Sequence, residues 1–369
     1  MRILVALPDA GLWALRRVDP YAPELSVWLG GLLDLAYDEY GLRTHVVIFG
    51  ERVGTRTQHL GIVTAVTKAL AGREAKVTHV EIANEGGHTG FSGPDGIEEL
   101  RAHAVYVAMR CRHLVALTSA EDYPPINDVQ GPDYVYAGAP VAVTMFEFHP
   151  DRDVNGDGGP YRPCRQPYGY KEYRLPHVGG AGEPRGPQSS VSETSDPVLL
   201  CADAAMVYLC GWARYVLHTG AGVFGMANQP GHPERPANVW EAPNWGPITQ
   251  ALTTLRANLP QDLPSWGQLC HANPKFNGQF PFVTLAGQSW DRAYTEHGTR
   301  GYAVRQGNRF MVIALKLEAP LELVAPVEMR YRVRSLTTWE PYETVLLSTG
   351  QIHTMPAFAG AVLIEGETL

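Results

Sequence analysis

The strongest constraint on the fold is the alternation of two apolar patterns along roughly the first 225 residues. Short apolar runs of strand length alternate with longer runs whose apolar residues recur at helical spacing. Successive parallel strands need a long connection, so this alternation predicts parallel strands joined by crossover helices. We predict strands at residues 2–7, 44–49, 77–82, 113–118, 141–149 and 218–225 and helices at 23–40, 60–70, 97–107, 198–217 and 248–259. In the second helix, one face is predicted to carry Leu60, Val63, Val66, Thr67 and Leu70.

The pattern changes after Pro260. Short alternating runs separated by turn residues take over, which is typical of antiparallel strands in a small sandwich. We therefore expect two domains, an α/β domain at residues 1–268 and a β-sandwich at residues 269–369.

Length, charge and cysteine content limit the class of protein. The chain has 369 residues, 45% of them hydrophobic, which suffices for one large domain and one small domain. Its net charge of −8, without a basic block, argues against nucleic acid as a partner. The five cysteines form no CxxC pair, so we expect neither a disulfide framework nor a metal, and no cofactor.

Two apolar stretches resemble targeting or membrane segments at first sight. The N-terminal run is interrupted by Pro8 and Asp9 and is predicted to be a strand, not a signal peptide. The most apolar long stretch, residues 198–217, contains the charged residues Asp203 and Arg214 and shows helical periodicity, which favours a barrel helix over a membrane span. We expect a cytoplasmic protein without a membrane partner.

Asn84 and Glu85 are the leading candidates for chemistry. They follow a short β-branched run and precede Gly86-Gly87, so they are predicted to lie at the C-terminal end of a strand. In an α/β barrel, the strand ends and the loops after them form the catalytic face. A carboxylate beside an amide suits acid/base chemistry on a sugar, although Glu85 could instead cap the next helix.

The sequence Ile82-Ala-Asn-Glu85, a second Glu in a later loop, a His-Thr-Gly strand at His218 and a closing strand at residues 356–366 occur together. This combination resembles the retaining (β/α)8-barrel glycoside hydrolases that carry a C-terminal β-sandwich. The resemblance implies a TIM-like barrel, with Glu85 as the general acid/base and Asn84 as the partner of the sugar 2-hydroxyl. In that superfamily Asn-Glu ends the fourth strand. Counting back therefore predicts that the first strand is missing, that the barrel is open there, or that the chain begins inside a longer gene.

A retaining enzyme needs two carboxyl groups about 5 to 5.5 Å apart, and two residues compete for the second role. Glu183, between glycines and Pro184, is predicted to lie at a tight corner after a strand and is preferred as the nucleophile. Glu193 precedes the predicted helix cap Asp196 by three residues, so it could simply be an acid facing the N-terminus of that helix.

Four further residues are candidates for contacts with the sugar. His149 and His218 end predicted strands, though each could be a hydrogen-bonded structural histidine. Trp240 and Trp245 occupy a predicted loop, where their rings could stack on sugar or simply cover the rim of a barrel.

Residues 151–157 match the start of a calcium loop. Arg162 stands where the loop needs a bidentate Glu, which favours a solvated acidic turn.

Two functions from different classes account for these features. The first is a glycosidase that cleaves O-glycosidic bonds by a retaining double displacement with two Glu residues. The second is a non-catalytic carbohydrate-binding or structural protein on a degenerate glycosidase barrel. In both, the expected partner is a carbohydrate.

Overall fold

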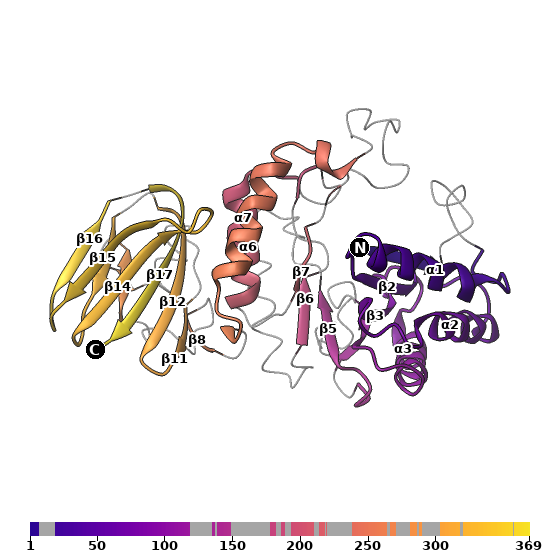
Figure 1. Ribbon diagram of the computed structural model, residues 1–369. Helices are drawn as coiled ribbons and strands as arrows, with labels where there is room; N and C mark the ends of the chain where they lie inside the picture. Colours follow the sequence, from indigo (N-terminus) through magenta and orange to yellow (C-terminus); the bar gives the residue numbers. More distant parts are fainter. Residues whose placement is uncertain are drawn as a thin grey trace. The chain divides into compact units, whose positions relative to one another are not determined.

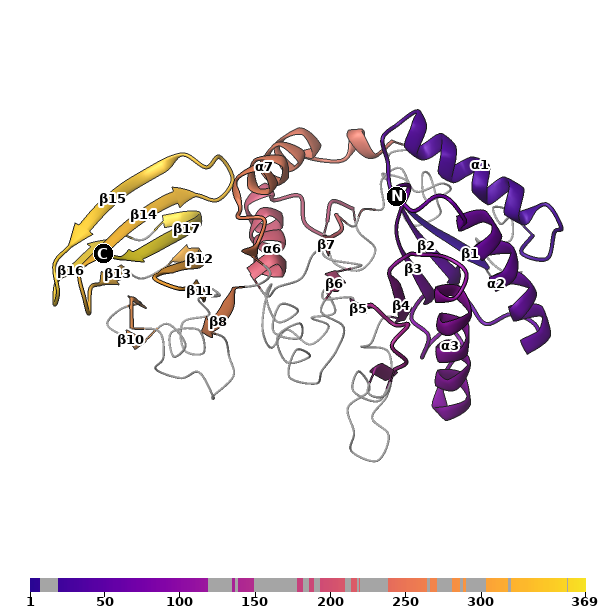
Figure 2. The ribbon, with the colours of Figure 1, turned by 60° about the horizontal axis from the view of Figure 1, so that its bottom comes forward.

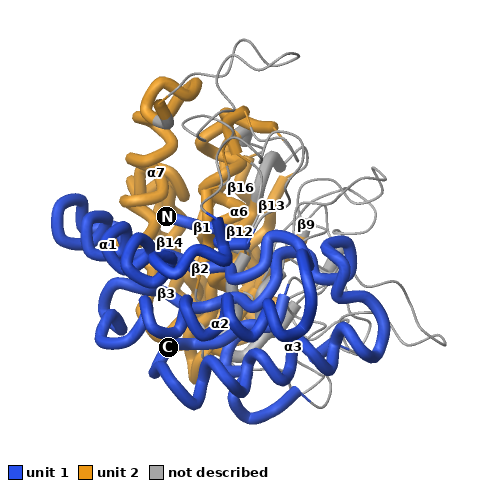
Figure 3. Tube along the Cα trace, turned by 90° about the vertical axis from the view of Figure 1, so that its right-hand side faces the viewer, with its two compact units in different colours: residues 1–149, 169–182 blue, residues 150–168, 183–369 orange. Residues whose placement is uncertain are grey.

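The computed structural model describes residues 1–6, 19–118, 135–136, 139–148, 178–181, 186–188, 193–209, 214–217, 219, 238–263, 266–270, 281–285, 288–289, 303–317, 320–356 and 358–369. The chain divides into two compact units, residues 1–149 with 169–182 and residues 150–168 with 183–369 (Figure 3). The domain boundary predicted at residue 268 falls within the second unit's range and stays a prediction.

A parallel sheet forms the centre of the first unit. Its strands are β1 (Arg2–Ala6), β2 (Thr44–Phe49), β3 (Val77–Ala83) and β4 (Val115–Thr118), in that order across the sheet. All six residues of β2 are buried, as expected of a central parallel strand covered on both faces. A second parallel pair consists of β5 (Met145–Phe148) and β6 (Val178–Ala181). These strands confirm the α/β prediction for this part of the chain.

Three helices connect the strands and lie on one face of the sheet, α1 (Leu25–Asp38), α2 (Arg56–Leu70) and α3 (Gly93–Ala108) (Figure 2). Helix α2 begins with a capping box in which Thr55 and Gln58 bond each other's backbone amides. Its buried face contains the predicted Val63, Val66, Thr67 and Leu70 but not Leu60, and it also contains His59, Ile62 and Ala69. Leu60 is 44% exposed, whereas the neighbouring His59 is buried, because the imidazole bonds Glu99 and the Val53 carbonyl.

The closure of the barrel stays a proposal. Among the described strands, β2 is the neighbour of β1, and residues 218–225, predicted as a last strand, lie outside the described part except Thr219. The expectation of a missing first strand or an open edge is therefore untested.

The second unit contains two antiparallel sheets (Figure 1). One has the order β10-β9-β13-β16 and the other β15-β14-β17-β12-β11-β8. The strands are β8 (Gly267–Cys270), β9 (Val283–Leu285), β10 (Gln288–Ser289), β11 (Ala303–Gln306), β12 (Arg309–Leu317), β13 (Leu321–Val324), β14 (Met329–Ser335), β15 (Pro341–Leu347), β16 (Ile352–Met355) and β17 (Phe358–Thr368). Val283 and Leu321 of the first sheet share one buried core with Val312, Tyr331 and Ile364 of the second, so the sheets pack face to face.

Two helices of the second unit pack together, α6 (Pro197–Leu209) and α7 (Trp245–Asn258), with a short 3-10 helix η3 (Val239–Glu241) before α7. Asp196 caps α6 as predicted, because its Oδ1 accepts a hydrogen bond from the Val198 amide. The helix ends at Leu209, so the predicted extension to residue 217 is wrong. Arg214–Tyr215 instead forms a short strand, β7, since periodicity alone separates helix from buried strand poorly in so apolar a stretch. None of the helices in the described ranges has the length and apolarity needed to cross a bilayer.

Candidate functional site

Asn84 and Glu85 lie directly after the last residue of β3, at the C-terminal end of a parallel strand. The backbone of Glu85 has φ 42°, in the left-handed region. A residue with a side chain adopts that region at a cost of about 1–2 kcal/mol relative to the right-handed form. The residue as a whole is half-buried.

The segment from residue 84 to residue 91, here called the Glu85 loop, is held by its own backbone and by β4. The Glu85 carbonyl accepts hydrogen bonds from the amides of His88 and Thr89, at 2.8 and 3.0 Å. The Gly86 amide donates to Thr118 Oγ1 at the end of β4, at 2.6 Å. Helix α3 begins only at Gly93, with Ser92 as its N-cap residue, so the alternative that Glu85 caps the next helix is wrong.

Next to Asn84, a buried polar network joins β1, β2 and β3. Arg2 Nη2 donates to Asn84 Oδ1 at 2.6 Å and to Glu81 Oε2 at 3.1 Å, and His45 Nε2 lies 3.0 Å from the same Glu81 oxygen. The rings of His45 and His79 stack with centroids 3.8 Å apart. Glu81 is fully buried, and a buried carboxylate requires such cationic or donor partners.

This network fixes the orientation of the Asn84 amide. A guanidinium group only donates hydrogen bonds, so the amide oxygen is the atom that faces Arg2. The amide nitrogen is then the side of Asn84 that can donate to a ligand. The network is not among our predictions from sequence, but a signal is present, because His79 and Glu81 stand at alternate positions of a strand that is apolar apart from Thr78.

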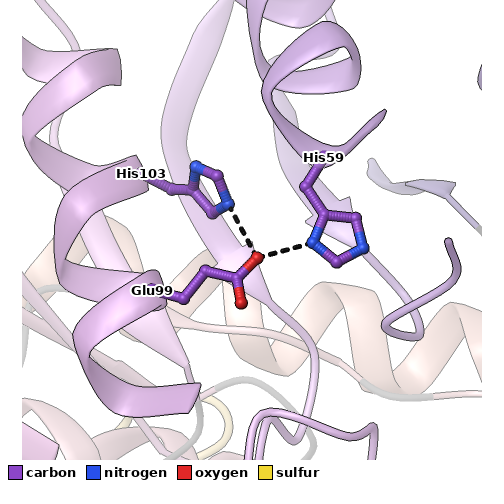
Figure 4. A group of neighbouring side chains, drawn as sticks. All are labelled: His59, Glu99 and His103. Atoms are coloured by element: carbon purple, nitrogen blue, oxygen red, sulfur yellow. Dashed lines mark hydrogen bonds and ion pairs between the residues drawn. The ribbon is translucent and has the colours of Figure 1, made fainter. Parts of the chain in front are cut away.

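A second polar cluster lies between α2 and α3 (Figure 4). Glu99 Oε1 is 2.6 Å from His59 Nδ1 and 3.5 Å from His103 Nε2. The other oxygen, Oε2, accepts Arg52 Nη2 at 2.6 Å and lies 3.4 Å from Arg56 Nε. Burial opposes the charged form of Glu99, but the hydrogen bond from His59 and the charge of Arg52 outweigh it and lower the pKa of the carboxyl group. Burial also lowers the pKa of His103.

His59, Glu99 and His103 offer ligand atoms within 4.8 Å of one another, so we tested whether they suit a metal ion. Both ring nitrogens of His59 face hydrogen-bond acceptors, since Nε2 lies 3.0 Å from the Val53 carbonyl. The separation of 2.6 Å between His59 and Glu99 is a hydrogen-bond distance, whereas two ligands of one tetrahedral zinc lie about 3.3 Å apart at bonds of 2.0–2.1 Å. With Arg52 already on the carboxylate, this cluster fits an ion-pair network better than a metal site.

The other candidates fall into two groups. Glu193, Trp240 and Trp245 belong to the second unit. Glu193 is exposed and its backbone bridges to Gly186, Trp240 in η3 is 66% exposed, and Trp245 is the half-buried first residue of α7. Asn244 Nδ2 donates to the Ser195 carbonyl at 2.9 Å, which joins the start of α7 to the segment that carries Glu193. Glu183, His149, His218 and the acidic segment 151–157 lie outside the described residues.

Comparison with known proteins shows a shared fold. A crystal structure of an α-amylase from Geobacillus thermoleovorans, complexed with acarbose, is 13% identical to this chain at a TM-score of 0.55, and the match covers 99% of this chain and 88% of that one. A crystal structure of an α-amylase from Lactobacillus plantarum is also 13% identical, at a TM-score of 0.52, with 99% and 90% of the two chains covered. No family model matches the chain, and no curated protein matches it.

Proposed function

We propose that this chain is a glycoside hydrolase in which Glu85 is the general acid/base and Asn84 binds the sugar 2-hydroxyl. The observation that carries the proposal is the left-handed backbone of Glu85 at the end of β3. Strained residues of this kind persist where the surrounding structure enforces them, and they concentrate at active sites. The fold shared with two α-amylases, which are glycoside hydrolases, supports the same function. The fold proposed with it is a TIM-like barrel over residues 1–268, followed by the sandwich.

The proposed reaction is a retaining double displacement. Glu85 gives its proton to the glycosidic oxygen while the second carboxylate, Glu183 in preference to Glu193, forms a bond to C1 and the leaving group departs as an alcohol. Glu85, now ionised, takes a proton from water as the water oxygen attacks C1, which releases the sugar and regenerates both carboxyl groups. Arg2 contributes by holding the Asn84 amide with its nitrogen directed away from the guanidinium.

The proposed substrate is a carbohydrate with an O-glycosidic bond, and the protein needs no metal or other cofactor for the two steps. His149 and His218 are proposed as hydrogen-bonding partners of the sugar hydroxyl groups. Trp240 and Trp245 are proposed as stacking surfaces for sugar rings. The high exposure of Trp240 is compatible with that role, because a ring that stacks on a ligand must be accessible before the ligand binds.

The test is hydrolysis of a panel of aryl glycosides and polysaccharides by the wild type and by Gln variants of the three Glu residues. Glu85→Gln should slow hydrolysis strongly for poor leaving groups and much less for activated aryl glycosides, which need little protonation. Glu183→Gln should abolish both activities, and if Glu193→Gln does so instead, the second carboxylate is Glu193. Glu98→Gln, exposed on α3, is the matched control and should behave as the wild type.

Two results would contradict the proposal. Full activity of Glu85→Gln on natural glycans would remove Glu85 from the mechanism. Sugar binding without any hydrolysis by the wild type would favour the alternative of a non-catalytic carbohydrate-binding protein.

A further inference from the structure

Arg52, in the loop between β2 and α2, bonds the Glu85 loop at consecutive residues. Its backbone amide donates to the Thr89 carbonyl at 2.8 Å, and its Nη1 donates to the Gly90 carbonyl at 3.2 Å. The guanidinium group also lies over the ring of Phe91, 5.4 Å from the ring centre. One residue therefore holds the whole C-terminal end of the Glu85 loop.

Arg52 is itself held by a closed ring of polar contacts. Its Nη2 donates to Glu99 Oε2, the other Glu99 oxygen bonds His59, and His59 Nε2 lies 3.0 Å from the carbonyl of Val53, the residue after Arg52. Glu99 and His59 are buried, so water competes little for the bond between them, whereas the Arg52 side chain is 30% exposed. The ring fixes the position of the Arg52 guanidinium relative to α2 and α3.

Packing leaves the loop little room to move. Phe91 is fully buried, with its ring 5.4 Å from that of Phe49. Gly96 in α3 lies so close to the loop that a Cβ there would be 2.3 Å from the Phe91 backbone. Gly90 has φ 97°, and a Cβ at this position would lie 3.0 Å from that of Arg52. Glycine at both positions permits this close approach of backbone to neighbour.

We propose that Arg52 is a positioning residue, which directs the carboxyl group of Glu85 by fixing the loop in which Glu85 stands. The inference rests on the proposed function of Glu85. Besides the Arg2 bond to Asn84, the loop has two anchors, at Gly86 by Thr118 and at residues 89–91 by Arg52, and the left-handed Glu85 lies next to the first of these two. Without the side-chain contacts of the second anchor, the strained backbone of Glu85 can relax, and its carboxyl group leaves the position needed for proton transfer.

The experiment compares Arg52→Gln with Arg56→Gln. Both variants remove one positive charge from beside Glu99. Arg56, however, is 63% exposed, and the ion pair that it makes in the described part of the chain is with Glu99. Arg52→Gln should lower kcat for a glycoside with a poor leaving group about 10- to 100-fold, with KM nearly unchanged, whereas Arg56→Gln should stay within about 2-fold of the wild type. Equal losses in the two variants would overturn the proposal, because they would show that only the charge beside Glu99 matters.

A double-mutant cycle shows whether Arg52 acts through Glu85. In a Glu85→Gln background, Arg52→Gln should cost less than about 3-fold in kcat, because the group that it positions is already gone. Additive losses would place the effect of Arg52 elsewhere and overturn the positioning role.

Amide signals of ¹⁵N-labelled glycine test the proposal without any activity. Arg52→Gln should shift or broaden the signals of Gly86, Gly87 and Gly90, and Arg56→Gln should leave them unchanged. If the wild type hydrolyses no glycoside, the proposed function fails, but these signals still decide whether Arg52 fixes the loop. Unchanged signals in Arg52→Gln overturn it. If Arg52→Gln does not fold, Arg52→Lys keeps the charge and removes the guanidinium fork, and the same comparison applies.

Discussion

Replacing Glu85 with Gly and with Ala separates the strain of its backbone from the loss of its side chain. Both substitutions remove the carboxyl group and the same contacts beyond Cβ. Only Gly adopts φ 42° without steric cost, whereas Ala keeps the clash between Cβ and the backbone. We therefore expect Glu85→Gly to be the more stable variant, although glycine is usually the less stable choice.

The size of the difference follows from the backbone alone. A residue with a side chain loses about 1–2 kcal/mol in the left-handed region, and glycine loses about 0.5–1 kcal/mol more conformational entropy than alanine on folding. The Gly variant should exceed the Ala variant by about 1 kcal/mol in the free energy of unfolding. For a unit of about 150–250 residues, that difference corresponds to about 2–4 °C in Tm.

Urea and thermal unfolding of the two variants measure this difference directly. The matched control is the same pair at Glu98, which is exposed within α3 and should show the opposite order, with Ala more stable than Gly by about 1 kcal/mol. If Ala equals or exceeds Gly at position 85 while the control behaves as expected, the backbone of Glu85 is not strained. The main argument for its functional role would then be lost.

Three further predictions concern stability. The pKa of His103 is lowered below 6.5 in the folded state. Its contribution to the free energy of unfolding is therefore present above pH 6.5 and is lost as the pH falls, by at most about 1.4 kcal/mol per pH unit. Glu99, His59 and Arg52 are the titratable and charged groups facing His103. Between pH 7.5 and pH 5.5, the free energy of unfolding measured with urea should fall less in His103→Gln than in the wild type. An equal fall in the two proteins would contradict this. Thr55→Ala removes the capping box of α2 and should lower the free energy of unfolding by about 1 kcal/mol, and no change would show that the cap is dispensable. Tyr331→Phe removes the buried hydroxyl that bonds the carbonyls of Val324 and Phe282. The Phe282 carbonyl still accepts from the Val324 amide, so the loss falls on the Val324 carbonyl and should cost about 1–3 kcal/mol; an unchanged urea midpoint would contradict that reading.

The strands were predictable from sequence where a strand is a short β-branched run with clear ends. The strand predicted at residues 77–82 ends at Ala83, directly before Asn84, so the sequence alone places Asn84 and Glu85 at its C-terminal end. The stretch after Val198 is apolar on all sides, and there the predicted helix ran past its end at Leu209. In such a stretch, hydrophobicity does not show where a helix gives way to a strand.

His79 and Glu81 mark polar positions in β3, but the partners in the polar networks could not be predicted, because the networks depend on contacts between residues distant in sequence. Arg2 and Glu81 are 79 residues apart, and His59 and Glu99 are 40 apart. Periodicity also assigns polar residues to the exposed side of a helix, and it therefore predicts Leu60 on the buried face of α2, where the structure has His59. Only the order and register of the strands and the packing of α2 on α3 bring these groups together.

The two networks share a feature that stability alone does not explain. In each, a buried carboxylate, Glu81 or Glu99, is paired with an arginine that also bonds the Glu85 loop, through Asn84 in one case and through Gly90 in the other. Replacing a buried ion pair by apolar residues of similar size is often neutral or stabilising, because taking the charges out of water is costly. An apolar pair, however, has no donors to direct at an amide oxygen or a carbonyl of the loop. A role in fixing the loop around Glu85 therefore explains the two networks better than a contribution to the stability of the fold.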